Sequence, residues 1–123
     1  MLNTSIKGIV KGDITSWYQP HLTREEATIQ LDAHSPGTFV FRKSHSVHTI
    51  EYGTENIVSL SLHLSIGIRH FLVGFKEKQW NIIGTSIYFI YFSDLIEYYS
   101  KHTIYRRYTT KFVKALPFYN LYA

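Results

Sequence analysis

Arg42, Ser44 and Ser46 have the types and spacing best suited to chemistry, because they alternate at the end of an apolar run. A guanidinium can donate two parallel hydrogen bonds to an anion, and hydroxyl groups can add further donors. Taken singly, an arginine at a strand end is usually a solvated charge or a surface ion pair worth about 0 to 1 kcal/mol. Loop serines alone are usually turn residues. Together, the three indicate a candidate anion site.

The net charge of the chain also favours an anionic partner. Thirteen Lys plus Arg against nine Asp plus Glu give a formal charge of +4, and the pI is about 9.3. Nucleic acid, acidic lipid and a phosphorylated peptide would each be attracted. The only dense basic run is Arg106-Arg107, so we expect no nucleic-acid partner and rank a basic surface for anionic lipid last.

Catalytic and metal-binding patterns are missing from the sequence. Nothing resembles a Gly-x-Ser-x-Gly, a His-Glu-x-x-His or a Gly-rich phosphate loop. The chain has no Cys, which excludes disulfides and thiolate ligands. His45 and His48 lack acidic or thiolate partners at ligand spacing, so a zinc site is not expected. We therefore expect a protein that is not an enzyme and has neither cofactor nor metal.

The size and composition predict one folded domain. The chain has 123 residues, of which 45% are hydrophobic, enough to form a core. Its longest apolar stretches are far shorter than the roughly 20 residues of a membrane span. Residues 1–12 lack the apolar block of a secretory signal, and the missing cysteines suit a reducing cytosol. We expect a monomer.

The first half of the sequence predicts a helix, a strand and a loop. Thr23 and Glu26 form a capping box before a helix from about Arg24 to Ala33. A run rich in aromatic and β-branched residues then predicts a strand over Thr38 to Lys43. Because this strand is apolar on both faces, we expect it to be central and covered on both sides. His45 to Asn56 is polar and aperiodic, as expected for a long loop.

The second half predicts three more strands and a second helix. Val58 to Leu64 alternates apolar and polar residues, and Ile68 to Phe75 and about Trp80 to Ile83 follow as strands. Apolar residues at helical spacing then predict a helix, with Ser93 as its N-cap and Asp94 in its first turn. The fold class is therefore α+β: a central antiparallel β-sheet flanked by two α-helices, one on each face.

Four ordered segments resemble the Src homology 2 family over about residues 16–117. They are Trp17-Tyr18 with Thr23 to Ala27, Gly37-Thr38-Phe39-Val40-Phe41-Arg42-Lys43-Ser44, Ile68-Arg69-His70-Phe71, and Phe92 to Tyr99. The second is similar to the family's Gly-x-Phe-Leu-Val-Arg-x-Ser signature. Residues 1–15 would be a lead-in that is partly mobile, and residues 118–123 a tail.

The resemblance implies a site for phosphotyrosine, whose nearly dianionic phosphate suits a guanidinium. Arg42 would bind the phosphate from the floor of a pocket too deep for phosphoserine. Arg24 would contact the phosphate and stack on the phenol ring. The other residues that the resemblance implies for the phosphotyrosine site are Ser44, Ser46 and the backbone near His45, which would cap phosphate oxygens, and Ser59 and His70, which would support the wall.

The resemblance also implies a groove for the peptide residues that follow phosphotyrosine. Phe71 and Tyr98 would line it, together with loops around Gly84 to Ile87 and His102 to Arg106. His70 can also be interpreted as a purely structural, hydrogen-bonded core residue, a role we favour over catalysis.

Two departures from the family pattern bear on this site. Many members have a Lys two residues after the strand His, where this chain has Leu72, so ring contact should depend more on Arg24. The connection between Arg42 and Val58 is several residues longer than usual. That loop would either close over the phosphate or disorder the cradle.

The expected function is a phosphotyrosine-peptide-binding module that recruits its protein to tyrosine-phosphorylated partners, as an adaptor in signal transduction. The first alternative is a divergent Src homology 2 scaffold that has lost phosphate binding. We expect the protein in the cytosol of a eukaryotic cell, either its own or, for a microbial effector, that of a host.

Overall fold

The computed structural model describes residues 17–44 and 57–118 of the chain. The elements are α2 (Arg24–Asp32), β1 (Thr38–Lys43), β2 (Ile57–Leu64), β3 (Gly67–Lys76), β4 (Gln79–Ile82), α4 (Phe92–Lys101) and β5 (Lys114–Ala115). The predicted lead-in, the whole of the predicted loop and all but the first residue of the predicted tail lie outside the described residues. His45, Ser46 and His48, for which the sequence made predictions, lie outside them as well.

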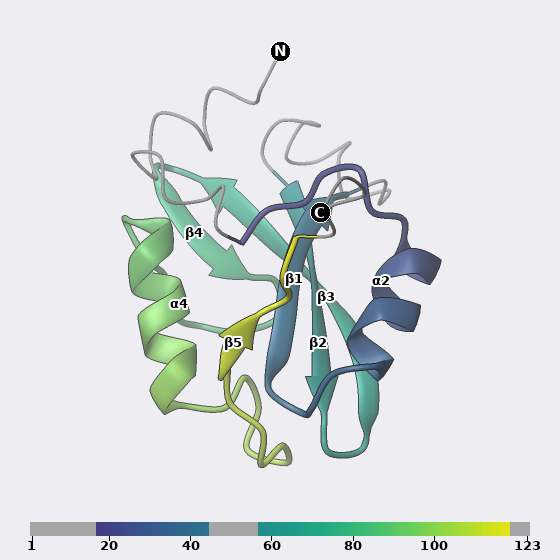
Figure 1. Cartoon of the computed structure of the whole chain (residues 1–123). Helices are drawn as coiled ribbons and strands as arrows, with labels where there is room; N and C mark the ends of the chain where they lie inside the picture. Colours follow the sequence, from purple (N-terminus) through teal and green to yellow (C-terminus); the bar gives the residue numbers. More distant parts are fainter. Residues whose placement is uncertain (1–16, 45–56, 119–123) are drawn as a thin grey trace.

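One five-stranded sheet in the order β4-β3-β2-β1-β5 forms the centre of the molecule (Figure 1). The four longer strands pair antiparallel, and β5 pairs parallel with β1. The register sets Arg42 of β1 opposite Ser59 of β2, and Ser61 of β2 opposite His70 of β3. The sheet therefore brings residues from three strands together at one place.

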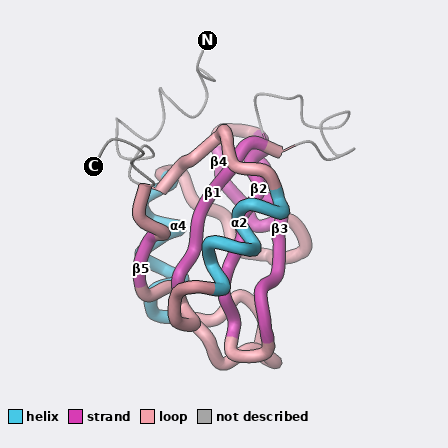
Figure 2. The backbone as a smooth tube through the Cα atoms, turned by 45° about the vertical axis from the view of Figure 1, so that its right-hand side comes forward, coloured by secondary structure: helices cyan, strands magenta, loops and turns pink. Residues whose placement is uncertain are grey.

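The two helices lie on opposite sides of the sheet, as predicted (Figure 1). Figure 2 shows α2 in front of β1, β2 and β3, and α2 contacts all three strands. Both helices in the described part of the chain fall short of the length and apolar content that a bilayer crossing needs. The α+β fold class is confirmed.

Helix α2 begins where its capping box predicts. The Thr23 hydroxyl accepts a hydrogen bond from the Glu26 N–H at 3.0 Å, and the Glu26 carboxylate accepts one from the Thr23 N–H at 2.9 Å. These bonds satisfy two N–H groups that the first turn leaves unpaired. The helix buries Ala27 and Leu31 against the sheet, so its opposite, polar side faces solvent.

The predicted strands are confirmed within one residue at each end. The strand Thr38–Lys43 is observed without change, and its first five residues are buried. It lies between β2 and the short β5, with a helix on each face. Arg42 is thus rooted in an interior strand.

The predicted N-cap of the second helix is wrong. Helix α4 begins at Phe92, and its N-cap is Tyr91, which has extended backbone and no capping side-chain bond. Phe92 is fully buried, with ring centroids 4.7 Å from Phe41 and 5.0 Å from Trp80. Core packing of this ring holds the helix start ahead of Ser93, which lies exposed in the first turn. Asp94 lies in the first turn, as predicted.

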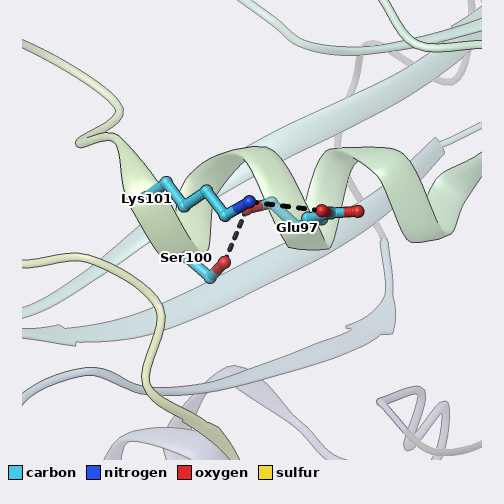
Figure 3. A network of polar contacts seen from close by, with 3 residues as sticks. All are labelled: Glu97, Ser100 and Lys101. Carbon is cyan, nitrogen blue, oxygen red and sulfur yellow. Dashed lines mark hydrogen bonds and ion pairs between the residues drawn. The ribbon is translucent and has the colours of Figure 1, made fainter.

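The outer side of α4 is polar. Figure 3 shows Lys101 Nζ paired with the Glu97 carboxylate at 3.3 Å and the Ser100 hydroxyl donating to the Glu97 carbonyl oxygen. Both charged side chains are about two-thirds exposed. The inner side, by contrast, buries Phe92, Leu95 and Tyr99.

Candidate functional site

A cavity of about 650 Å³ opens between the first turn of α2 and the sheet. Because side chains alternate along a strand, the same face of the sheet carries Val40 and Arg42 of β1. Val40 packs into a small apolar cluster with Leu31 of α2, and Arg42 lies further along the strand. The cavity is lined by Pro20, His21, Leu22, Thr23, Arg24, Glu25, Arg42, Ser59, His70, Phe71 and Leu72.

Arg42 is a cation within this cavity with little access to solvent. Arg42 is only 6% exposed to solvent. Its Nε donates a hydrogen bond to Ser61 Oγ at 2.9 Å, and its Nη2 lies 3.4 Å from His70 Nδ1. No carboxylate of the described residues forms an ion pair with it. Among the described residues, these contacts engage Nε and one N–H of Nη2, so the remaining N–H groups can donate to a ligand.

The pKa of Arg42 is lowered from its ordinary value. Burial is the largest cause, because desolvation disfavours the charged form. The nearby Arg24 cation lowers it further, and Glu25 opposes both effects. Arginine nonetheless stays protonated in proteins, so the site holds an incompletely compensated positive charge.

A directed chain of hydrogen bonds supports Arg42 from behind. The Ser61 hydroxyl, which accepts from Arg42, lies 2.7 Å from His70 Nδ1. His70 Nε2 lies 3.2 Å from the Thr28 hydroxyl, which donates to the Arg24 carbonyl oxygen at 2.9 Å. Since Thr28 and Ser61 each have one hydrogen to donate, this pattern assigns His70 the neutral Nε2–H form.

The surroundings of His70 favour that neutral form. The pKa of His70 is lowered from 6.5 to about 4, first by burial and then by Arg24 and Arg42; Arg69 adds slightly, and Glu25 opposes the shift. At neutral pH, His70 Nδ1 is therefore an acceptor. A charged imidazole would instead direct a second donor at Ser61 and Arg42.

Charged and polar residues of the α2 N-terminus form the mouth of the cavity. Arg24 and Glu25 are exposed there, beside His21. Both Arg24 and Glu25 act electrostatically on Arg42 and His70. The mouth thus carries one cation and one carboxylate, and the floor carries a second cation.

The structure brings together five of the residues predicted for the site, namely Arg24, Arg42, Ser59, His70 and Phe71, which all line the cavity. Ser44 is buried just after β1 and does not line it. The roles assigned to these side chains stay predictions.

Sequence reasoning missed Ser61, Thr28 and Glu25. The alternation along β2 could have found Ser61, because it shares a face with Ser59. Helical spacing could have found Thr28, which lies one turn after Arg24 on the same side of α2. Glu25 carried no signal apart from its place beside Arg24.

The residues predicted for a groove fall into three places, the first of which is the cavity around Arg42, where Phe71 lies. Gly84 and Ile87 line a second cavity of about 390 Å³, together with Tyr99. Tyr98 lies apart from them, in a cavity of about 250 Å³, where its ring stacks on His102 at 4.2 Å between centroids.

One aromatic contact links residues that line the first two cavities. Phe71 lines the cavity around Arg42. Its ring centroid lies 6.3 Å from that of Tyr105, which lines the second cavity. Within residues 17–44 and 57–118, no group of three or more His, Asp or Glu side chains is placed to hold a metal ion. The arrangement presents a buried cation, Arg42, to an anionic ligand in the first cavity.

Comparisons with known proteins identify this architecture. The model of the SH2 domain family matches residues 17–99, which is more than half of the chain. A solution NMR structure of the SH2 domain of a CRK/CRKL homolog from Monosiga brevicollis matches with a TM-score of 0.67. That match has 23% identity and covers 82% of this chain and 86% of the other, so it shows the fold. No curated protein matches the sequence.

Proposed function

Because this chain belongs to the SH2 (Src homology 2) domain family, we propose that its Arg42 cavity binds phosphotyrosine and recruits its protein to tyrosine-phosphorylated partners. The general class is a phosphotyrosine-binding module. SH2 domains are binding modules, generally without enzymatic activity, and are typically cytoplasmic. We extend that location to this chain, and we propose that it acts as a monomer.

One observation carries the proposal: Arg42 is a buried cation without a carboxylate partner among the described residues, and it faces a cavity. Desolvating a charge is unfavourable unless a partner compensates for it. A phosphate monoester with close to two negative charges at pH 7 is a suitable partner. Two of its oxygens can accept the two parallel N–H hydrogen bonds that a guanidinium donates.

The position of Arg42 supports selection of phosphotyrosine over phosphoserine. The guanidinium lies on an interior strand below a mouth formed by the first turn of α2. A phosphate at the end of a phenol ring extends further from its backbone than one on a serine side chain. We therefore propose that only the longer side chain brings its phosphate to Arg42.

Arg24 and Leu72 line the cavity and would contact the phenol ring. Leu72 supplies apolar contact where many family members have a lysine. Arg24 is then the cation available to stack on the ring and reach the phosphate. Ser59 and His70 would form the wall, and Ser44, Ser46 and the backbone near His45 would cap the remaining oxygens.

Calorimetric titration tests the proposal with one peptide in three forms: phosphotyrosine, tyrosine and phosphoserine at the same position. We expect the phosphotyrosine form to bind at least about 30-fold more tightly than the other two, the equivalent of one strong charge-assisted contact. Equal affinity for the phosphotyrosine and tyrosine forms would overturn the proposal and favour the divergent scaffold.

A further inference from the structure

The mouth of the Arg42 cavity carries a carboxylate that has no bonded partner in the described part of the chain. Glu25 lies in the first turn of α2 and lines the cavity. It is exposed, and no described residue forms a hydrogen bond or ion pair with its carboxylate. Its neighbour Glu26 differs, because the Glu26 carboxylate accepts a hydrogen bond from the Thr23 N–H at 2.9 Å. Glu26 therefore holds the helix start, whereas the Glu25 carboxylate is available to act on a ligand.

The charge of Glu25 acts on the floor of the cavity. Burial and Arg24 lower the pKa of Arg42 and of His70, and Glu25 opposes both shifts. A carboxylate that favours a cation at one position disfavours an anion there, because the sign of the Coulomb interaction reverses. A phosphate bound at Arg42 would bring close to two negative charges to this position. Glu25 should therefore oppose the ligand that Arg24 and Arg42 attract.

The same carboxylate is favourable for the fold. An anion in the first turn of a helix interacts favourably with the helix dipole, and Glu25 lies in the first turn of α2. Arg24 is its neighbour in sequence, but side chains at i and i+1 of a helix do not face each other. The charge of Glu25 is thus not removed by a local ion pair. Its loss should change stability and anion binding in opposite directions.

We propose that Glu25 limits the affinity of the Arg42 cavity for phosphotyrosine, and with it the margin by which phosphotyrosine is preferred over tyrosine. This inference rests on the proposed function, since it requires the phosphate to lie at Arg42. The cavity then has two cations that attract the phosphate and one carboxylate that repels it. An uncharged tyrosine side chain is not repelled, so the carboxylate acts on the difference between the two ligands.

Glu25→Gln tests this inference, because it removes the charge and keeps the size of the side chain. Calorimetric titrations would use one peptide in its phosphotyrosine and tyrosine forms. Affinity for the phosphotyrosine form should rise about fivefold near about 0.01 M ionic strength, and the gain should fall below about twofold in about 1 M salt. The tyrosine form should gain less than about twofold or stay too weak to detect, because it carries no charge for Glu25 to repel. The melting temperature should fall by about 1 to 5 °C.

Asp32→Asn is the matched control, since it removes one negative charge from the other end of α2. Asp32 is exposed, does not line the cavity and lies about 10 Å further along the helix axis. Its effect on phosphotyrosine affinity should stay below about twofold at the same ionic strength. A gain as large as that of Glu25→Gln would show that net charge acts, and not the place of Glu25.

The outcomes separate this inference from the proposed function. A purely structural role of Glu25 would lower affinity and melting temperature together. Unchanged or lower phosphotyrosine affinity in Glu25→Gln, or a gain that Asp32→Asn equals, would overturn the inference alone if binding still depends on phosphorylation. Wild-type binding that does not depend on phosphorylation would overturn the proposed function, and this inference with it.

Discussion

On one face of the sheet, β1 and β2 contribute Phe41 and Leu60 to an aromatic core beneath α4. On the other face, the same strands contribute Arg42, which lines the cavity beside α2, and Ser61, which accepts a hydrogen bond from it. On the α4 face, aromatic rings pack against one another. On the α2 face, a buried cation is held by a series of hydrogen bonds. Neighbouring residues on one strand thus have opposite chemistry.

The main core and the cavity proposed for binding thus lie on separate faces of the sheet. The α4 face buries the largest side chains, including Trp80, Tyr99 and Phe41. The α2 face has a smaller apolar cluster, which includes Leu31 and Val40. Beside this cluster lie the hydrogen-bonded Arg42, Ser61 and His70. Substitutions on the two faces should therefore affect different measurements.

The largest effect is expected from Phe41→Ala on the α4 face. Phe41 is fully buried, so its loss removes apolar contacts and leaves a cavity. The free energy of unfolding, measured by urea denaturation, should fall by about 3 to 5 kcal/mol. A loss below about 1 kcal/mol would show that this face does not hold the main core.

Ser61→Ala should have the next largest effect, and mainly on binding. Ser61 connects Arg42 to His70, and its removal leaves the buried Arg42 Nε–H without its partner. We expect phosphopeptide affinity to fall by about 1 to 3 kcal/mol, measured by calorimetry. Ser100→Ala is the control, because Ser100 is an exposed serine on α4, away from the cavity around Arg42. Equal losses in both variants would show that the chain does not position Arg42.

Acid should weaken the α2 face through His70. Its folded pKa of about 4 is below the ordinary 6.5, so its contribution to stability is complete above about pH 6.5 and is lost as the pH falls towards 4. The difference in unfolding free energy between the wild type and His70→Gln should shrink over that range. A difference that stays constant would contradict the neutral assignment.

The smallest effect is expected from the most visible ion pair, Glu97–Lys101 on α4 (Figure 3). Both side chains are largely exposed and their spacing is i,i+4, so the pair should contribute about 0.3 to 0.5 kcal/mol. Lys101→Ala should lower the unfolding free energy by no more than that, and added salt should remove the difference. A loss above about 1 kcal/mol would show that the outer side of α4 contributes to stability.

The sequence predicted both helices, the four longer strands and the residue at the floor of the cavity, because these depend on local patterns, whereas the two-residue β5 gave no such pattern. Alternation identified β2, and the capping box identified the start of α2. Arg42 was found by its place at the end of an apolar strand and by the family signature around it. Ser93 was wrongly chosen as a cap because local chemistry favoured it, whereas the core position of Phe92 fixed the helix start.

The support behind the site could not be predicted in the same way. Hydrogen bonds connect Ser61 to His70 and His70 to Thr28. His70 and Thr28 are 42 residues apart in the sequence. This series of hydrogen bonds depends on the strand register and on where α2 lies across the sheet. Similarly, the choice between Tyr98 and Tyr99 for the second cavity depends on the rotation of α4, which one residue of sequence difference does not reveal.

The most direct test of the separation between faces is Arg42→Met, measured for both phosphopeptide affinity and unfolding free energy, with the exposed neighbour in Lys43→Met as control. Phosphopeptide affinity should fall by about 2 to 5 kcal/mol, because the phosphate loses its buried partner. Unfolding free energy should change by less than about 1 kcal/mol, because an uncompensated buried cation is replaced by an apolar side chain of similar length. Unchanged affinity, or a loss of stability as large as the loss of affinity, would contradict the account.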